Sequence, residues 1–366
     1  MNPPNSIPEG FSASRIKSET ERPRRDIIVI GASAGGVSPL RQILKDLPAD
    51  FAAAIFVVLH IGATSHLAEI LDHSTDLPVV QAVSGQPIAP GRVYVAVPGF
   101  HLLLHDNHLL LLHDNHLLLR RGPRENMARP AIDPLFRSAA CTFGARVIGV
   151  LLSGALSDGS AGLRAINRCN GIAVVQEPSD ASVPEMPLNA LRYADIDYVA
   201  PARGVAELLI RLTREQAGET PPIPLELRLE TAIAAQEVSG MGVDEQLGSP
   251  SRFTCPECHG TLWEIMDGRQ LRYRCHVGHA YTAESMLDAQ ATQTEEVLWS
   301  LLRSHQERAA LVRRMAEQER VQNRGGLADR LQQRAAGYDE DAAVVRSLLR
   351  GRPAMSGNDD PEQDVA

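Results

Sequence analysis

The segment DIIVIGASAGGVSPLRQIL, residues 26–44, begins with an apolar run rich in isoleucine and valine. A run that is apolar at every position predicts a strand buried on both faces, since a strand with one wet face would alternate. The small residues of GASAGG follow, and after them Leu40, Ile43 and Leu44 recur at helical spacing. The segment therefore predicts a buried strand, a tight turn and a helix, which together begin a βαβ unit.

The same order of buried strand and helix recurs as far as about Gln216. The further strand-like runs are AAIFVVLH (53–60), VVQAV (79–83), RVYVAV (92–97), RVIGVLL (146–152) and GIAVV (171–175). Helix-like segments lie between them, among them SHLAEILDH (65–73), IDPLFRSAACTF (132–143) and SAGLRAINRC (160–169). This alternation predicts an α/β domain over residues 26–216, with a doubly wound, mostly parallel sheet and helices on both faces.

The composition indicates an acidic globular protein. The chain has 366 residues, of which 44% are hydrophobic, enough for a sizeable core. Its net charge of −9 provides no basic footprint for nucleic acid or anionic lipid. No apolar run approaches the ~18 residues of a membrane span, so we expect a cytoplasmic protein without membrane insertion. The odd number of cysteines, five, favours a reducing compartment over a disulfide framework.

Composition divides the rest of the chain into further segments. They are a disordered leader (1–25), a linker (217–250), a zinc-ribbon-like Cys/His module (251–283), a helical hairpin (284–350) and a disordered tail (351–366). The hairpin is predicted from apolar residues at helical spacing on both sides of the break NRGG, residues 323–326. The Cys/His module and this hairpin either dock on a receptor or a partner helix, or the helices dimerise, and the sequence does not favour one of these.

The turn GASAG, residues 31–35, has two interpretations. In a dinucleotide-binding turn, glycines let the backbone approach a pyrophosphate at a helix N-terminus. Here Ser33 replaces the second glycine of that fingerprint, and His60 stands where an acidic ribose-binding residue is expected, which disfavours a nucleotide-dependent oxidoreductase. In a nucleophile turn, small flanking residues permit a sharp bend that exposes the serine hydroxyl. We therefore favour Ser33 as a nucleophile.

Two further side chains fall at ends of predicted strands. His60 closes one strand, and Asp158 follows another. The carboxyl ends of parallel strands share one crevice, so we expect Ser33, His60 and Asp158 to meet there as a catalytic triad. Ser33 would attack, His60 would move the proton, and Asp158 would orient the ring. Backbone N–H groups around Ala34 and Ala155 are candidates for the oxyanion hole.

Five segments together resemble the catalytic domain of the chemotaxis protein-glutamate methylesterases of the CheB family. They are DIIVIGASAGGVSPL, FVVLHI, VYVAVPGFHLLL, GPRENMARPAIDPLFRSAA and GVLLSGALSDGSAGL, in that order between about Asp26 and Leu212. The resemblance implies hydrolysis of glutamyl methyl esters on the cytoplasmic helices of methyl-accepting chemoreceptors, with glutamine deamidation in some members. It also implies Ser33, His60 and Asp158 as the catalytic residues, with no cofactor for catalysis.

The chain departs from the family pattern at two places. The usual donor loop TGMGxDG reads SGALSDG here, with Ala155 in place of methionine and Leu156 in place of glycine. This change leaves open a second hypothesis, a catalytically inactive, esterase-like zinc-ribbon scaffold that binds a receptor or partner. In addition, the usual N-terminal receiver domain has no counterpart in residues 1–25, so we expect no control by phosphorylation of a receiver in the same chain.

Three cysteines and a histidine near the C-terminal end have the spacing of a structural zinc site. Cys255, Cys258, Cys275 and His279 form the pattern C-x2-C-x16-C-x3-H. Thiolates and imidazole in two short turns suit tetrahedral Zn²⁺, and a site filled by four protein ligands does not catalyse. Alternative fourth ligands are His276 and His259, also in this segment. The other interpretation is three reduced cysteines that pack against the helices.

The octapeptide LLLHDNHL occurs twice in succession, over residues 102–117. Without one copy, the stretch fits a β-hairpin of the family. An insertion of eight residues, an even number, leaves every strand residue facing the same side of the hairpin as before. We therefore predict a duplicated piece of hairpin. Its histidines could bind a metal adventitiously, but nothing predicts a functional site there; they are His105, His108, His113 and His116.

Overall fold

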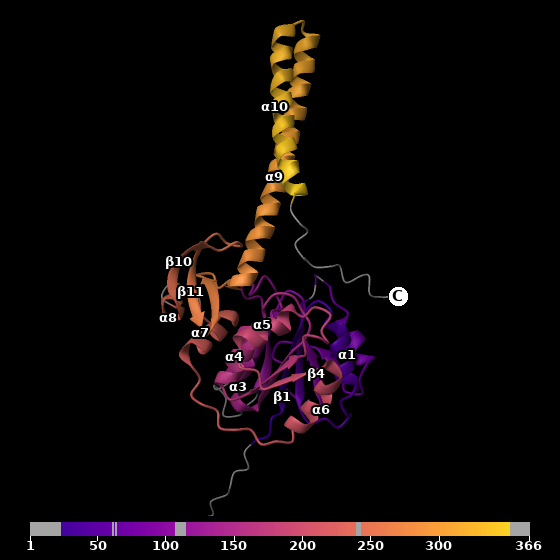
Figure 1. Ribbon diagram of the computed structural model, residues 1–366, viewed down its shortest axis with the longest axis vertical. Helices are drawn as coiled ribbons and strands as arrows, with labels where there is room; N and C mark the ends of the chain where they lie inside the picture. Colours follow the sequence, from indigo (N-terminus) through magenta and orange to yellow (C-terminus); the bar gives the residue numbers. More distant parts are fainter. Residues whose placement is uncertain (1–22, 61, 63, 107–114, 239–242, 352–366) are drawn as a thin grey trace, which may run out of the picture.

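The computed structural model describes residues 23–60, 62, 64–106, 115–238 and 243–351 (Figure 1). Its centre is a seven-stranded sheet in which every neighbouring pair of strands is parallel. The strands lie in the order β3 (Val79–Gln81), β4 (Arg92–Val95), β2 (Ala54–Leu59), β1 (Ile27–Ala32), β7 (Val147–Leu151), β8 (Ile172–Gln176) and β9 (Tyr198–Ala200). The predicted parallel sheet is confirmed.

Helices cover both faces of this sheet because each central strand is apolar on both sides. Along β1, Ile27 and Val29 join one core cluster, whereas Ile28 and Ile30 join the other. The first face is covered by α3 (Ile132–Phe143), α4 (Ser160–Arg168) and α5 (Glu185–Tyr193). The second is covered by α1 (Val37–Lys45), α2 (Leu67–Asp72) and α6 (Ala202–Leu212). Burial of each such side chain stabilises the fold by about 1.5–3 kcal/mol.

Two paired strands lie at the two ends of the segment that contains both copies of the octapeptide, residues 102–117. β5 (His101–Asp106) and β6 (Asn115–Arg120) pair in antiparallel register and pack against α3 through Leu102, Leu104 and Leu117. His105 faces His116 across the ladder, with their ring centres 5.4 Å apart. His108 and His113 lie outside the described residues, as does the rest of the connection between the two strands, residues 107–114.

The segment predicted as a linker, residues 217–250, contains regular structure. It holds α7 (Leu225–Ala234), the short α8 (Asp244–Leu247) and the start of β10 (Ser249–Thr254). α7 packs against the catalytic domain with Leu227, Ile233 and Glu230 buried. The structure therefore has a packed helix where a connector with little core was predicted. The sequence signal of α7 is weak because the helix buries few apolar residues and its buried carboxylate, Glu230, has its partners elsewhere in the chain.

A second, four-stranded antiparallel sheet carries the Cys/His pattern. Its strands are β10, β11 (Thr261–Asp267), β12 (Gln270–Cys275) and β13 (Ala280–Thr282), in that order. We call this sheet and its turns the ribbon. From it α9 (Ala283–Val321) runs out of the globular body, and α10 (Gly325–Arg350) folds back beside it, as predicted for the hairpin (Figure 1). Among the described residues, no helix is long and apolar enough to cross a membrane.

Candidate active site and candidate metal centre

The turn after β1 holds Ser33 against the loop that follows β7. Ser33 N–H donates to the carbonyl of Ser153 over 2.9 Å. Gly35 has φ +70, a backbone conformation that residues with a side chain rarely adopt, and a Cβ there would lie 2.7 Å from Ser182 Cβ. The small residues of GASAGG therefore make the bend that leaves the Ser33 side chain partly exposed before α1 begins at Val37.

The structure brings Ser33, His60 and Asp158 together at the carboxyl ends of β1, β2 and β7. His60 Nδ1 lies 3.1 Å from Ser33 Oγ, and its Nε2 lies 2.7 Å from Asp158 Oδ2. An ionised Asp158 accepts a hydrogen bond from Nε2–H, so the proton stays on Nε2 and the lone pair of Nδ1 faces the serine hydroxyl. This is the tautomer that a general base for Ser33 requires.

Asp158 is buried, yet it stays ionised. Burial opposes ionisation, but the hydrogen bond and charge of His60 and the backbone N–H of Ile132 outweigh it and lower the pKa of Asp158 to about 2. Ile132 N–H donates to Oδ2 over 2.7 Å, and Asp133 N–H donates to Oδ1 over 3.2 Å. Both N–H groups belong to the first turn of α3, where the helix dipole favours a negative charge.

A second carboxyl group, that of Asp133, lies beside Asp158. Its Oδ1 accepts hydrogen bonds from the N–H groups of Gly159 and Gly162 at the start of α4. Burial, followed by the charge of Asp158, raises the pKa of Asp133 well above its usual value. Asp133 therefore joins α3 to α4 beside Asp158.

The loop from Ser153 to Gly159 passes directly against Ser33. The N–H of Gly154 is occupied by the carbonyl of Val183, at 3.0 Å, so it is not a free oxyanion donor. Within the described part of the chain, the N–H groups of Ala34 and Ala155 have no such acceptor, and they stay candidates for that role. Leu156, which replaces the family's glycine, adopts φ +62, and Asn189 holds its carbonyl at 2.7 Å.

We expect Gly154→Ala to lower kcat by about 10- to 100-fold, because a shift of about 1 Å at the reacting atoms has that effect. A Cβ at this position would lie 2.7 Å from Ser33 Cβ and 2.5 Å from Met186 Cε, so either the serine or the loop must move. The matched control is Gly337→Ala, where a Cβ meets nothing within 4 Å. Steady-state kinetics of both variants check this, and an unchanged kcat for Gly154→Ala would contradict it.

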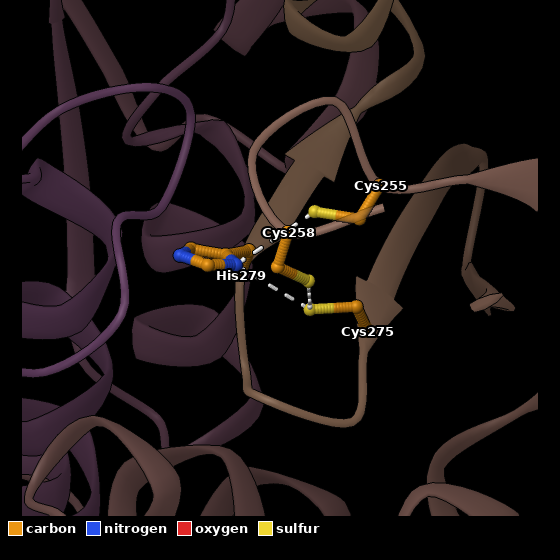
Figure 2. Close-up of side chains that lie close together, drawn as sticks. All are labelled: Cys255, Cys258, Cys275 and His279. Carbon is orange, nitrogen blue, oxygen red and sulfur yellow. Dashed lines mark hydrogen bonds between the residues drawn. The ribbon is translucent and has the colours of Figure 1, made fainter. Parts of the chain in front are cut away.

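The pattern C-x2-C-x16-C-x3-H closes into one cluster between two turns of the ribbon (Figure 2). The ligand atoms of Cys255, Cys258, Cys275 and His279 all lie within 4.8 Å of one another. Cys258 Sγ is 3.6 Å from Cys275 Sγ, and Cys275 Sγ is 3.5 Å from His279 Nδ1. Zn–S bonds of about 2.3 Å place two sulfurs about 3.8 Å apart in a tetrahedron, so these residues fit a zinc ion.

The surroundings of the cluster select His279 over the other histidines. Glu257 Oε2 lies 3.3 Å from His279 Nε2, which leaves Nδ1 free to face the three sulfurs. A carboxylate on the far nitrogen is the usual partner of a metal-binding histidine. His276 instead packs against the ring of Trp263, at 4.1 Å between centres, and His259 lies beside Gln293. Neither of the two belongs to the cluster.

We expect the purified full chain to bind a single zinc ion, and Cys275→Ser to lose it and to unfold at a lower temperature. In small modules the free energy of metal binding contributes directly to folding. The control is Cys141→Ser, which alters a partly buried cysteine outside the cluster. Metal content and thermal unfolding are the two measurements. Zinc retained by Cys275→Ser at the level of the control would rule this site out.

One residue of the site has no signal of its own in the sequence. Asn126, in the loop before α3, is buried and donates from Nδ2 to Asp158 Oδ1 over 2.9 Å and to Asp133 Oδ2 over 3.0 Å. It lies within GPRENMARPAIDPLF, one of the segments that carry the family resemblance, but nothing in its spacing marks it. Its left-handed backbone, φ 51, is one that asparagine tolerates better than most residues.

Comparison with known proteins gives concordant matches over this domain. Residues 28–209 match the family described as CheB methylesterase. A protein of Leptospira interrogans, provisionally named protein-glutamate methylesterase/protein-glutamine glutaminase, is 40% identical over 189 residues, which are 51% of this chain and 94% of that protein. A protein-glutamate methylesterase/protein-glutamine glutaminase of Anaeromyxobacter dehalogenans is 37% identical over 56% of this chain and 58% of its own length.

Among solved structures, the chain is similar to the crystal structure of the Thermotoga maritima CheB methylesterase catalytic domain. The two are 34% identical, with a TM-score of 0.48, and the match covers 51% of this chain and 98% of that domain. The family match ends at residue 209, before the ribbon and the helical hairpin begin.

Proposed function

The chain belongs to the CheB methylesterase family, and on that premise we propose that it hydrolyses glutamyl methyl esters on a chemoreceptor to glutamate and methanol. The observation that carries the proposal is the hydrogen-bonded line from Ser33 Oγ through His60 to Asp158, with contacts of 3.1 and 2.7 Å. A serine hydroxyl needs such a base to attack an ester at neutral pH. The substrate would be the cytoplasmic helices of the receptor, so we infer that the enzyme acts in the cytoplasm.

The reaction proceeds in two halves. Ser33 Oγ attacks the ester carbonyl carbon while its proton passes to His60 Nδ1, and backbone N–H groups of the Ala34 and Ala155 loops stabilise the oxyanion. The C–O bond to the methoxy group then breaks, and His60 gives its proton to the leaving group to form methanol. Water attacks the acyl-enzyme by the same route, which releases the glutamate side chain and restores the Ser33 hydroxyl.

Deamidation of glutamine would use the same groups, with ammonia in place of methanol as the leaving group. The names of the relatives include this glutaminase activity. The alternative, an inactive scaffold, is disfavoured because His60 lies within hydrogen-bonding distance of both Ser33 and Asp158, and because the lowered pKa of Asp158 keeps its carboxylate ionised. We assign a structural role to zinc in the ribbon, and no step of the reaction passes through it.

The direct test is release of methanol from methylated receptor by the full chain, together with the appearance of glutamate at the methylated positions. We expect both products in equal amounts. A glutamine-bearing receptor, assayed for ammonia, reports deamidation separately. If the full chain releases no methanol from any of a panel of methylated receptors, the inactive scaffold becomes the better account.

A further inference from the structure

The ribbon is joined to the catalytic domain by buried ion pairs. Arg274 of β12 lies 3.2 Å from Glu125, which also binds Arg137 of α3 at 2.7 Å. Arg272, two residues earlier on β12, binds Glu230 of α7 at 2.8 Å. All five side chains are buried. Movement of the ribbon away from this position would leave buried charges without a partner, which is strongly destabilising. The ion pairs therefore hold the ribbon in this position against the catalytic domain.

Asn126 joins this ribbon to the triad through the two ends of a single carboxamide. Its Nδ2 donates to Asp158 and Asp133, whereas its Oδ1 accepts from Thr282 N–H and Ser285 Oγ, each over 3.0 Å. Backbone N–H can only donate and an ionised carboxylate can only accept, so the orientation of this amide is determined by its partners. Asn126 N–H also donates to the carbonyl of Ala280, at 2.8 Å.

The same turn of the ribbon contacts the donor loop beside Ser33. Ser157 Oγ, next to Asp158, lies 2.7 Å from Thr282 Oγ1, and it donates to Glu284 Oε2 over 3.2 Å. Glu284 in turn accepts a hydrogen bond from the hydroxyl of Tyr193 at the end of α5. Thr282 is the N-cap of α9, and Ser285 completes its capping box, so the start of the long helix is part of this contact.

We propose that the ribbon and the first turn of α9 are a positioning element of the esterase site, which holds Asp158 through Asn126 and thereby sets the turnover rate. This inference rests on the proposed function and adds a positioning contact to its site. Asn126 is a positioning residue, because its side chain forms hydrogen bonds with Asp158, Asp133 and the start of α9. It forms none with Ser33 or with the ring of His60.

The size of the expected effect is set by two facts. Hydrogen bonds to a charged group carry enough free energy for a change of about 10- to 100-fold. Yet a relative of which 94% aligns with this domain has little length left for a ribbon, so the element adjusts activity and is not itself the catalyst. We therefore expect partial losses in kcat with little change in KM.

The experiment uses the full chain and three variants. Asn126→Gly removes the carboxamide and suits the left-handed backbone, and we expect kcat to fall by about 10- to 100-fold with KM within about twofold. Ser285→Ala removes the donor to Asn126 Oδ1 on the ribbon side, together with the capping-box acceptor of Thr282 N–H, and we expect a fall of about 3- to 10-fold. Ser300→Ala, an exposed serine of the same helix, is the control and should equal the parent protein.

The double variant Asn126→Gly/Ser285→Ala tests whether Ser285 affects kcat through Asn126. If Ser285 acts through Asn126, the double variant is no slower than Asn126→Gly alone, because the second change has nothing left to act on. Losses that multiply, or an unchanged kcat in Ser285→Ala, overturn the proposal. Should circular dichroism show that Asn126→Gly does not fold, the comparison of Ser285→Ala with Ser300→Ala decides alone. A parent protein that releases no methanol contradicts the proposed function instead.

Discussion

Ser33→Ala lowers kcat for methyl-ester hydrolysis by about 10⁴- to 10⁶-fold, because members of a serine triad act as a unit and the nucleophile cannot be replaced by water at the same rate. The side chain lies 3.1 Å from its base and is partly exposed, so its loss changes chemistry and not the core. We expect KM and the midpoint of thermal unfolding to stay close to those of the parent.

The matched control is Ser38→Ala, a change at an exposed serine in the first turn of the helix that follows Ser33. It should retain full activity. Methanol release under saturating receptor measures both variants. Activity of Ser33→Ala within tenfold of the control would mean that another group attacks the ester.

Asp158→Asn is expected to lower kcat by about 10⁴-fold, because an amide in place of the carboxylate favours the wrong tautomer of the histidine. With an N–H facing Nε2, the proton of His60 moves to Nδ1, and the ring can no longer accept from Ser33 Oγ. Since burial is outweighed by the bonds that lower the pKa of Asp158 to about 2, the parent carboxylate stays ionised from neutral pH down to about pH 3.

The same substitution should also lower stability. Asp158 accepts hydrogen bonds from the N–H groups of Ile132, Asp133 and Gly159, and an amide leaves some of these donors unpaired. The depressed pKa of the parent carboxylate contributes stability that is present above the unfolded value, near pH 4, and is lost as the pH falls towards 2. Asp76→Asn, at an exposed site, is the control for both kinetics and unfolding.

The fold of the catalytic domain could be predicted because its signals are local. An apolar strand such as residues 27–32 indicates burial on both faces, and the order of strands and helices then selects a parallel sheet. The meeting of Ser33, His60 and Asp158 followed from the same rule, since each stands at the carboxyl end of a strand. The Cys/His cluster was predictable as well, because its members are close in sequence and their spacing is that of two turns.

Contacts between distant segments could not be predicted in this way. Asn126 meets Ser285, 159 residues later, and Glu125 meets Arg274, 149 residues later, through a docking that no periodicity encodes. Helix α7 was missed for the same reason, since its burial depends on Arg272 of the ribbon as a partner for Glu230. An assay of residues 26–216 alone would remove these partners together, so the full chain is the proper subject of the kinetic tests.

Trapping of the acyl-enzyme tests the central claim most directly. The full chain is mixed with a slowly hydrolysed activated ester, quenched in acid, digested and examined by mass spectrometry. We predict a single acylated site, Ser33, which forms within the first turnover and is absent from Ser33→Ala and strongly reduced in His60→Ala. Acyl groups on another residue, or sustained ester hydrolysis with no covalent species on Ser33, would contradict the account.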